Sequence, residues 1–181
     1  MTPEEKARVK IDQMFDDAGW KVVDRDFYSP TITAAAIREG LLEGNREADY
    51  FLFVNGKAVG VLEAKRKEVD VASDIVCDQA IRYTRYVPKC YQAYARPLPF
   101  IYVSNGEETY FRDCRIEESE LEETNRIHTP KEIVKMLGIE DPFAGLPTLK
   151  KKGLRDCQYE AITELESSFR AGQNRALIVL A

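Results

Sequence analysis

Asp49, Glu63 and Lys65 are the residues of this sequence whose types and spacing could do chemistry. Asp49 opens one apolar run, Glu63-Ala64-Lys65 closes a second, and Asn55-Gly56 joins the two. Ionisable groups at the ends of buried strands are costly unless they are paired or bound to a metal. Two carboxylates can hold Mg²⁺, which prefers oxygen ligands, and a nearby lysine can orient or deprotonate an attacking water. The trio therefore predicts metal-assisted hydrolysis of a phosphodiester, and the alternative is a hairpin whose charged ends simply face solvent.

The register of this hairpin decides whether the three side chains converge. Side chains alternate between the faces of a strand, so a strict two-residue turn at Asn55-Gly56 would pair Asp49 with Leu62, on the wrong face. We predict instead a three-residue loop, Val54–Gly56, whose bulge pairs Asp49 with Val61, or an equivalent irregularity near Asp49. A regular hairpin with Asp49 facing away would contradict the metal site.

Several further short motifs accompany the trio. They are Gly44-Asn45-Arg46-Glu47-Ala48-Asp49-Tyr50, Glu63-Ala64-Lys65, Gln79-x-x-x-Tyr83 and Val103-Ser104-Asn105-Gly106. Together these motifs resemble the PD-(D/E)xK nucleases. Over most of the chain, from about Thr2 to Ala181, the sequence resembles the N-terminal nuclease domain of type I restriction endonuclease R (motor) subunits. The residue before the motif's aspartate is Ala48 rather than proline, which is a common departure.

The resemblance implies an α/β fold with a central mixed β-sheet flanked by helices, the restriction-endonuclease-like core. It implies Mg²⁺-dependent cleavage of double-stranded DNA: Asp49 and Glu63 would ligate the metal and Lys65 would position the attacking water. Gln79 and Tyr83 would support the site. An intact subunit of this kind would translocate DNA with ATP and work with modification (methyltransferase) and specificity subunits. Two alternatives remain open: a nuclease domain of another helicase-fused or stand-alone system, and a degenerate nuclease fold that acts as a docking or DNA-contact module.

Further candidate residues each have a structural explanation beside the functional one. Gln79 and Tyr83 are four residues apart and share a helical face, so without the resemblance they would be a core tyrosine bonded to a glutamine. Arg46 could contact phosphate or pair with a nearby acid. In PD-(D/E)xK nucleases an acid of the first helix often reaches the metal. Glu4 is the candidate and Glu5 the alternative, although an acid there is also a favourable helix-dipole charge.

Composition excludes several classes of protein. The chain has 181 residues and a single histidine, His128, which excludes His-based catalysis and multi-His metal sites. Four cysteines without a Cys-x-x-Cys pair indicate neither a zinc site nor a disulfide framework. No apolar run approaches the roughly 18 residues of a membrane span, and the N-terminus lacks a signal-peptide core. We therefore expect a cytoplasmic protein that does not bind membranes.

The charge of the chain is unevenly distributed. A net charge of −5 argues against a free-standing, tight, nonspecific DNA binder, but not against a nuclease that other subunits deliver to DNA. A basic group follows the proposed site and could neutralise phosphates, or it could be a solvated helix face. This group consists of Lys65-Arg66-Lys67, Arg82, Arg85, Lys89 and Arg96.

The sequence divides into three predicted parts. Residues 1–140 carry the nuclease motifs, residues 141–153 have the proline, glycine and lysine content of a linker, and residues 154–181 resemble the beginning of a superfamily 2 helicase motor. Gln158 lies where such motors read adenine. No G-x-x-x-x-G-K-[ST] motif occurs, so we expect the chain to be truncated before the Walker A motif and not to bind ATP by itself.

Periodicity, capping and turn signals predict the secondary structure. Helices are predicted from Thr2-Pro3 to Ala18 and over Asp70–Tyr86, Lys131–Leu137 and Arg155–Ala171. Strands are predicted within Trp20–Phe27, over Thr31–Arg38, on both sides of Asn55-Gly56, and over Pro99–Ser104, Glu107–Arg112 and Arg175–Ala181. Glu39–Asn45 is predicted as a connection, and Glu117–Glu123 as a loop or short helix.

Overall fold

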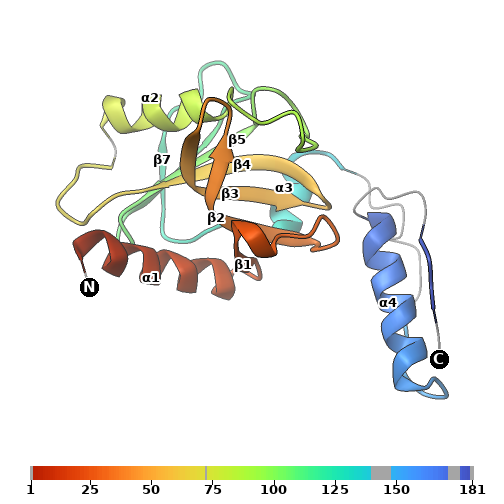
Figure 1. The fold of residues 1–181 in the computed structure, drawn as a ribbon. Helices are drawn as coiled ribbons and strands as arrows, with labels where there is room; N and C mark the ends of the chain where they lie inside the picture. Colours follow the sequence, from red (N-terminus) through yellow and green to blue (C-terminus); the bar gives the residue numbers. More distant parts are fainter. Residues whose placement is uncertain (1, 72, 140–147, 171–175, 180–181) are drawn as a thin grey trace.

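A seven-stranded sheet runs through the protein, in a computed structural model that describes residues 2–71, 73–139, 148–170 and 176–179. The strands are β1 Lys21–Asp24, β2 Ala34–Leu42, β3 Arg46–Val54, β4 Lys57–Ala64, β5 Phe100–Ser104, β6 Thr109–Asp113 and β7 Glu122–Thr124. They lie side by side in sequence order (Figure 1). The pairs β1/β2 and β4/β5 are parallel and the other neighbours are antiparallel. The sheet is mixed, as predicted.

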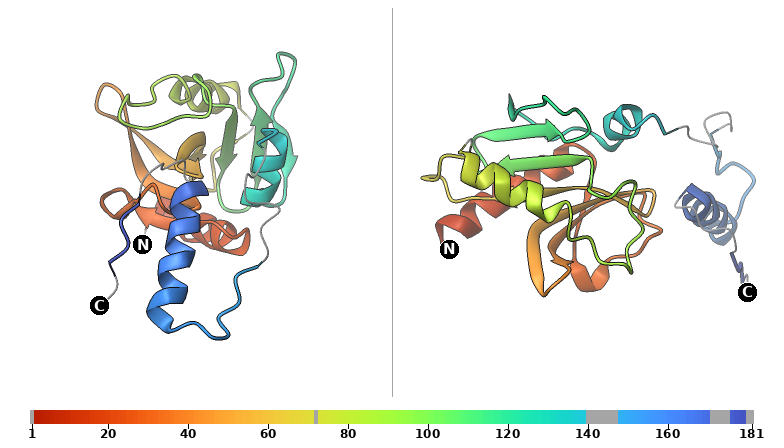
Figure 2. Two further views of the ribbon diagram at one scale, coloured as in Figure 1. Left: turned by 90° about the vertical axis from the view of Figure 1, so that its right-hand side faces the viewer. Right: turned by 90° about the horizontal axis from the view of Figure 1, so that it is seen from above.

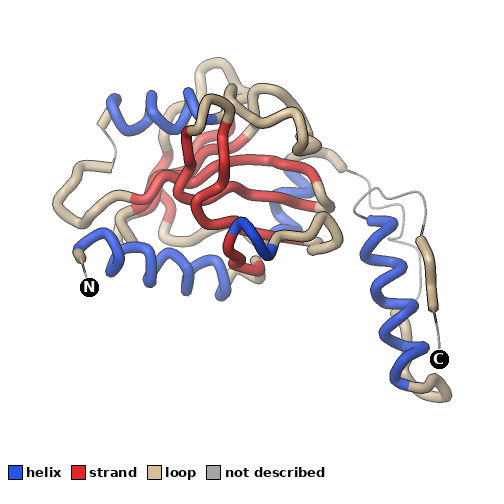
Figure 3. The backbone as a smooth tube through the Cα atoms, in the orientation of Figure 1, coloured by secondary structure: helices blue, strands red, loops and turns tan. Residues whose placement is uncertain are grey.

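Helices cover both faces of the sheet (Figure 1). α1, Pro3–Asp17, lies against one face, and α2, Asp74–Tyr83, lies against the other and connects the parallel strands β4 and β5. The tube in Figure 3 shows the resulting layers of helix, sheet and helix. The other helical elements are the 3₁₀ turn η1 Arg25–Phe27, α3 Pro130–Met136 and α4 Asp156–Arg170.

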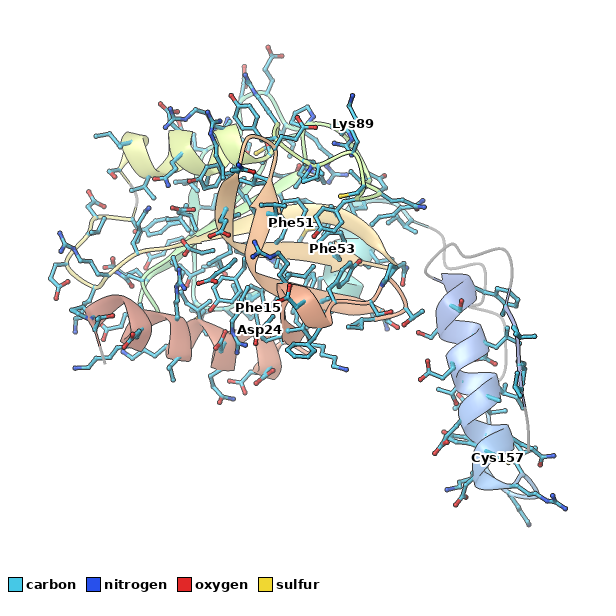
Figure 4. The ribbon with its side chains drawn as sticks, viewed as in Figure 1. Phe15, Asp24, Phe51, Phe53, Lys89 and Cys157 are labelled. Carbon is cyan, nitrogen blue, oxygen red and sulfur yellow. The ribbon has the colours of Figure 1, made fainter. Side chains whose placement is uncertain are left out.

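Aromatic side chains fill a core on each side of the sheet. Phe51 and Phe53 point to the α2 side, where their ring centroids lie 5.2 Å apart (Figure 4). On the other side, Phe15 of α1 packs against Tyr50, with 5.1 Å between ring centroids. Because helices cover both faces, the second half of β3, Tyr50 to Val54, is a continuous buried run rather than an alternating one.

α1 begins where the sequence predicts. The Thr2 side chain accepts a hydrogen bond from the Glu5 N–H at 3.2 Å, and the Glu5 carboxylate accepts one from the Thr2 N–H at 2.8 Å. This capping box satisfies two N–H groups at the helix start, and Pro3 occupies the first turn. α3 starts with the same reciprocal pair, formed by Thr129 and Glu132.

The β3–β4 hairpin closes with a tight two-residue turn. Asn55-Gly56 has φ angles of 49° and 72°, and Val54 pairs directly with Lys57. Both left-handed residues fit the type I′ turn that matches the twist of the flanking strands. The predicted three-residue loop is therefore wrong, and so is the pairing of Asp49 with Val61 that depended on it.

A bulge further along the hairpin restores convergence. The register shifts between Leu52 and Phe53, where Val59 is the extra residue on β4. The pairs beyond the bulge run as far as Tyr50 and Leu62, and the same register puts the next residues, Asp49 and Glu63, level with each other. Directly opposed residues share a face of the sheet, so both carboxylates point to the same side. The irregularity predicted as the alternative to the long loop is thus present, although it lies nearer the turn than Asp49.

β2 is longer than predicted. It continues to Leu42 rather than ending at Arg38, so most of the predicted connection Glu39–Asn45 belongs to the strand. Glu39 has a φ of 51°, in the left-handed region, and pairing with β3 is interrupted there. Pairing resumes at Gly40 in unchanged register, because β3 continues to supply backbone partners on the far side of the irregular residue.

Three other predicted boundaries are wrong. α2 begins at Asp74 and ends at Tyr83, several residues inside the predicted Asp70–Tyr86. Strand β7, Glu122–Thr124, takes in the end of the predicted loop or short helix Glu117–Glu123, because its backbone pairs with β6. Residues 176–179 of the predicted C-terminal strand form no strand with any described part of the sheet, and Leu177 and Val179 are exposed.

α4 confirms the predicted helix within the residues that the structure describes. It lies beside the sheet rather than on it, as the two further views in Figure 2 show. The Ser167 hydroxyl donates to the Thr31 carbonyl at 2.7 Å. Residues 141–147 of the predicted linker lie outside the described residues, so the division into domains stays a prediction.

Two predictions from composition concern the whole chain. The four cysteines, all of which lie in the described ranges, form no disulfide with one another. Within the described ranges, no helix has the length and apolar character needed to cross a bilayer.

Candidate active site

The ends of β3 and β4 bring the three predicted catalytic residues to one cavity. Asp49, Glu63 and Lys65 line it together with Ala64 and with Arg8 of α1, and its volume is about 220 Å³. The two-residue spacing keeps the glutamate and the lysine on one side of β4. The bulge in the hairpin turns the aspartate to that side as well.

Asp49 is held by a donor on each carboxylate oxygen. Its Oδ2 accepts the backbone N–H of Ala64 at 2.8 Å, and its Oδ1 accepts from the Arg8 guanidinium at 2.5 Å. The side chain is 16% exposed, so it reaches the cavity without lying free in solvent. These bonds fix the orientation of the carboxylate relative to β4.

Glu63 is the most deeply buried charged group of the site. Its side chain is 5% exposed, and its Oε1 accepts from Lys65 Nζ at 2.6 Å and from Gln79 Nε2 at 2.7 Å. Burial raises the pKa of Glu63, and the charge of Asp49 raises it further, while the Lys65 ammonium opposes the shift. In the described part of the chain no donor contacts its Oε2, which leaves that oxygen available to a ligand.

Gln79 and Tyr83 lie on one face of α2, directed at the end of β4. The Gln79 amide donates to Glu63 and to the Tyr83 hydroxyl, the latter at 2.9 Å, and its Oε1 accepts from Lys65 Nζ at 3.2 Å. The glutamine therefore links the glutamate, the lysine and the tyrosine. Gln79 thus contacts two residues of the site, and Tyr83 contacts Gln79, while their role in supporting the site stays a prediction.

The turn between β5 and β6 fixes the backbone around the site. Lys65 N–H donates to the Ser104 carbonyl at 2.8 Å, which ties the end of β4 to β5. The Asn105 side chain accepts from two backbone N–H groups of the turn. Gly106 has a φ of 82°, and a Cβ there would meet Lys10 and the Ala7 carbonyl of α1 at 3.0 and 3.1 Å. The close approach that only glycine permits thus seats α1 beside the cavity.

Three of the predicted residues make their contacts outside the cavity. Arg46 stacks over the Tyr86 ring at 4.4 Å and has no salt bridge within the described residues. Gln158 lies on α4, where its Oε1 accepts the Arg155 N–H at 3.0 Å. The Glu5 carboxylate caps α1, and the side chain of Glu4 lies outside the described part of the structure. The first-helix metal ligand therefore stays a prediction.

The basic residues after the site do not form one group. Lys67 pairs with Glu107 at 2.9 Å. The Arg96 guanidinium donates to backbone carbonyls of the loop after α2, so its role is structural. Arg82, on α2, and Arg85, in the turn that follows it, are exposed and remain available to an anionic partner.

Arg8 is the cavity residue that sequence reasoning missed. It follows Ala7 and precedes Ile11, both buried, so it borders the apolar stripe of α1 and was assigned to no role. Such a border position is the only local signal that the side chain lies against the sheet. Its contact with Asp49 joins residues 41 positions apart and could not be read from spacing.

The donor chemistry of the cavity fits a hard divalent cation. Mg²⁺ is commonly bound by one or two carboxylates, with waters and substrate phosphate completing the shell. Asp49 and Glu63 supply two such carboxylates on one cavity wall. Among the described residues, no three His, Cys, Asp or Glu side chains gather as a complete ligand set. A zinc-type site is thus not formed by these residues, whereas a partly hydrated Mg²⁺ site is compatible with them.

Comparison with known proteins places the chain among restriction enzyme subunits. The family model described as "Type I restriction enzyme EcoKI endonuclease subunit second domain" matches residues 29–137. The chain is 26% identical over 233 aligned residues to the type I restriction enzyme EcoKI endonuclease subunit of Escherichia coli (strain K12). That alignment covers 98% of this chain and 20% of the relative, so the chain spans about a fifth of the relative's length.

A solved structure has the same fold. It is a fragment of a protein assigned as an HsdR subunit of a type I restriction enzyme from Vibrio vulnificus YJ016, with a TM-score of 0.55 and 22% identity. The match covers 80% of this chain and 27% of that chain. At this identity the likeness shows the fold alone. The family match, in contrast, takes in more than half of the sequence, and the chain therefore belongs to the family of type I restriction enzyme endonuclease subunits.

Proposed function

We propose that this chain is the nuclease domain of a type I restriction enzyme R subunit and cleaves double-stranded DNA with the help of Mg²⁺. The observation that carries the proposal is the convergence of Asp49, Glu63 and Lys65 in one cavity, with Gln79 bonded to two of them. A PD-(D/E)xK nuclease requires this combination of two carboxylates and a lysine. The family of the chain supports it, since its relatives are described as endonuclease subunits.

The roles follow from the contacts. Asp49 and Glu63 would hold Mg²⁺, which when bound neutralises charge on the scissile phosphate and lowers the pKa of water. Lys65 Nζ is 2.6 Å from Glu63 and 3.2 Å from Gln79, which aims the ammonium into the cavity to orient the attacking water. Gln79 bonds both Glu63 and Lys65 and so fixes their side chains relative to each other, and the Tyr83 hydroxyl accepts from the Gln79 amide and orients it.

The wider assignments rest on the family of the chain. In the intact subunit, ATP-driven translocation would reside in a motor region that begins at about residue 154, after a linker over residues 141–153, and Gln158 would contact adenine there. Modification and specificity subunits would bring the nuclease to DNA in the cytoplasm. Since target recognition would lie in those partners, residues 1–140 should cut with little sequence preference.

The test uses the full-length subunit assembled with its partner subunits. Supercoiled-plasmid cleavage and DNA-stimulated ATP hydrolysis are measured in Mg²⁺ for Lys65→Ala and for Lys67→Ala, a control two residues away that pairs with Glu107. Lys65→Ala should lose cleavage by about 100-fold or more with ATP hydrolysis intact, as expected for a proton-transfer or water-orienting group. Lys67→Ala should cut at near the wild-type rate. Near wild-type cleavage by Lys65→Ala would instead favour a docking or DNA-contact module.

A further inference from the structure

The guanidinium of Arg8 bridges two carboxylates at the mouth of the cavity. One nitrogen donates to Asp49 Oδ1 at 2.5 Å and another to Glu39 Oε1 at 3.1 Å. Asp49 is 16% exposed at its side chain, whereas Glu39 is 59% exposed and lies on the solvent side of the bridge. Arg8 therefore has an inner partner that belongs to the proposed metal site and an outer partner that does not.

The outer partner sits in an unusual backbone conformation. Glu39 has a φ of 51° within β2, directly level with Asp49 on β3, and regular pairs flank it on both sides. Left-handed backbone is rare for residues other than Gly, Asn and Asp, and it persists only where the surroundings impose it. Arg25 additionally donates to the Glu39 carbonyl at 3.3 Å. β2 thus places the Glu39 carboxylate beside Asp49, although the backbones of the two residues do not pair as they would in a regular ladder.

The inner contact competes with any cation at the site. Asp49 Oδ2 accepts the N–H of Ala64, which belongs to the backbone of β4, whereas Oδ1 accepts from Arg8, a side chain that can move away. We propose that Arg8 is a positioning residue of the nuclease site: it holds Asp49 while no metal is bound, releases it to the cation, and, still anchored by Glu39, donates to a DNA phosphate. This inference rests on the function proposed above.

Charge balance supports the exchange. The metal-free site sets three carboxylates, Asp49, Glu63 and Glu39, against two cations, Arg8 and Lys65, which leaves a net charge of about −1. A bound divalent cation changes that balance to about +1, which favours a phosphate and leaves Arg8 without its inner partner. A guanidinium is well suited to this second role, because its planar fork matches phosphate oxygens.

The first experiment measures Mn²⁺ binding to this chain by calorimetry, without DNA. Arg8→Met should bind Mn²⁺ about tenfold more tightly than wild type, because the competing cation is gone. Lys10→Met is the matched control: it removes one positive charge from the same helix, but from a side chain paired with Glu107. Its Mn²⁺ affinity should stay within about twofold of wild type, since exposed charges are screened. Glu39→Gln should weaken Mn²⁺ binding in the wild-type background and change it little in Arg8→Met.

The second experiment measures binding of a short DNA duplex by fluorescence anisotropy at saturating Mn²⁺. Arg8→Met should bind the duplex more weakly than Lys10→Met, so that one substitution tightens metal binding and loosens DNA binding. A merely structural Arg8 would lower both affinities and the melting temperature together, and that result would overturn the proposal.

The remaining outcomes separate this inference from the proposed function. If Asp49→Asn abolishes Mn²⁺ binding and Arg8→Met leaves it at the wild-type affinity, the role of Arg8 is overturned and the proposed nuclease site is not. Absence of any Mn²⁺ binding that depends on Asp49 would overturn both.

Discussion

Replacement of Glu63 by glutamine should stabilise the metal-free protein while it removes a proposed metal ligand. The Glu63 side chain is 5% exposed, and its Oε1 accepts from both Lys65 and Gln79. A glutamine oxygen can accept the same two bonds. What Glu63→Gln loses is the charge attraction to Lys65, and what it gains is relief from burying an anion beside Asp49.

The pKa of Glu63 shows which effect is larger. Burial and the charge of Asp49 raise it despite the Lys65 ammonium, so the fold disfavours the ionised glutamate. Replacement of a whole buried ion pair by apolar groups often stabilises a protein by about 1–4 kcal/mol, whereas removal of one partner costs stability when the other charge is left buried and unpaired. Lys65 is 20% exposed and also donates to Gln79, so this second cost is small here. We therefore expect the low end, about 1 kcal/mol, which corresponds to a rise in melting temperature of about 2–4 °C for a chain of this size.

Thermal unfolding followed by circular dichroism at pH 7 with a chelator provides the measurement. Because the folded-state pKa of Glu63 is raised, the fold favours the protonated acid. This contribution to stability is complete below the pKa of the unfolded state, about 4.3, and is lost as the pH rises through the pKa of the folded state. The advantage of Glu63→Gln should therefore be present at pH 7 and shrink towards pH 4. The exposed Glu117→Gln is the control and should change nothing. A lower melting temperature for Glu63→Gln at pH 7 would refute the reasoning.

Three further predictions concern stability. Burial lowers the pKa of His128, so the fold favours the neutral imidazole. This contribution to stability is complete above the pKa of the unfolded state, about 6.5, and is lost as the pH falls through the pKa of the folded state. The urea midpoint of unfolding should therefore drop towards pH 5 in the wild type, and it should drop less in His128→Gln. Gly60→Ala should cost about 1–3 kcal/mol in urea unfolding, since its Cβ would lie 2.6 Å from the Phe100 carbonyl, and a neutral result would mean that β5 can shift. Tyr50→Phe should cost about 1–2 kcal/mol, because it leaves Asp12 without a 2.8 Å hydroxyl donor; an unchanged midpoint would show that bond to be dispensable.

Features that depend on neighbouring residues were predictable from the sequence. Both capping boxes, at Thr2 and Thr129, follow from residues three apart whose side chains and backbones bond each other. The placement of Glu63 and Lys65 on one side of β4 follows from strand alternation alone. The same local logic placed Gln79 above Tyr83 on one face of a helix.

Features that depend on distant strands were not predicted. The hairpin bulge at Val59 lies next to Gly60, which pairs with Phe100 of β5 and where a Cβ would clash with the Phe100 carbonyl. An isolated glycine within a strand does indicate a bulge or a close backbone approach, so Gly60 was an available signal. β7 forms only because β6 offers it an edge, and Glu122–Thr124 has no strand character of its own.

The contact between Arg8 and Asp49 had no signal in local spacing. It requires α1 to lie across the sheet, which in turn depends on the close approach at Gly106. A charged residue beside an apolar helical stripe usually faces solvent, so its type alone predicted an exposed arginine. A site residue such as Arg8, which lies on a different element from the Asp49…Lys65 motif, cannot be found from the spacing of the motif.

Anomalous diffraction from crystals of this chain grown with Mn²⁺ tests most directly whether the cavity is a metal-dependent nuclease site. We predict an anomalous peak for a Mn²⁺ ion within bonding distance of Asp49 and Glu63. Lys65 should face this ion, and the Arg8 guanidinium should have moved away from Asp49. The peak should vanish in crystals of Asp49→Asn. A cavity without a peak, or a peak that Asp49→Asn leaves unchanged, would contradict the assignment of this site.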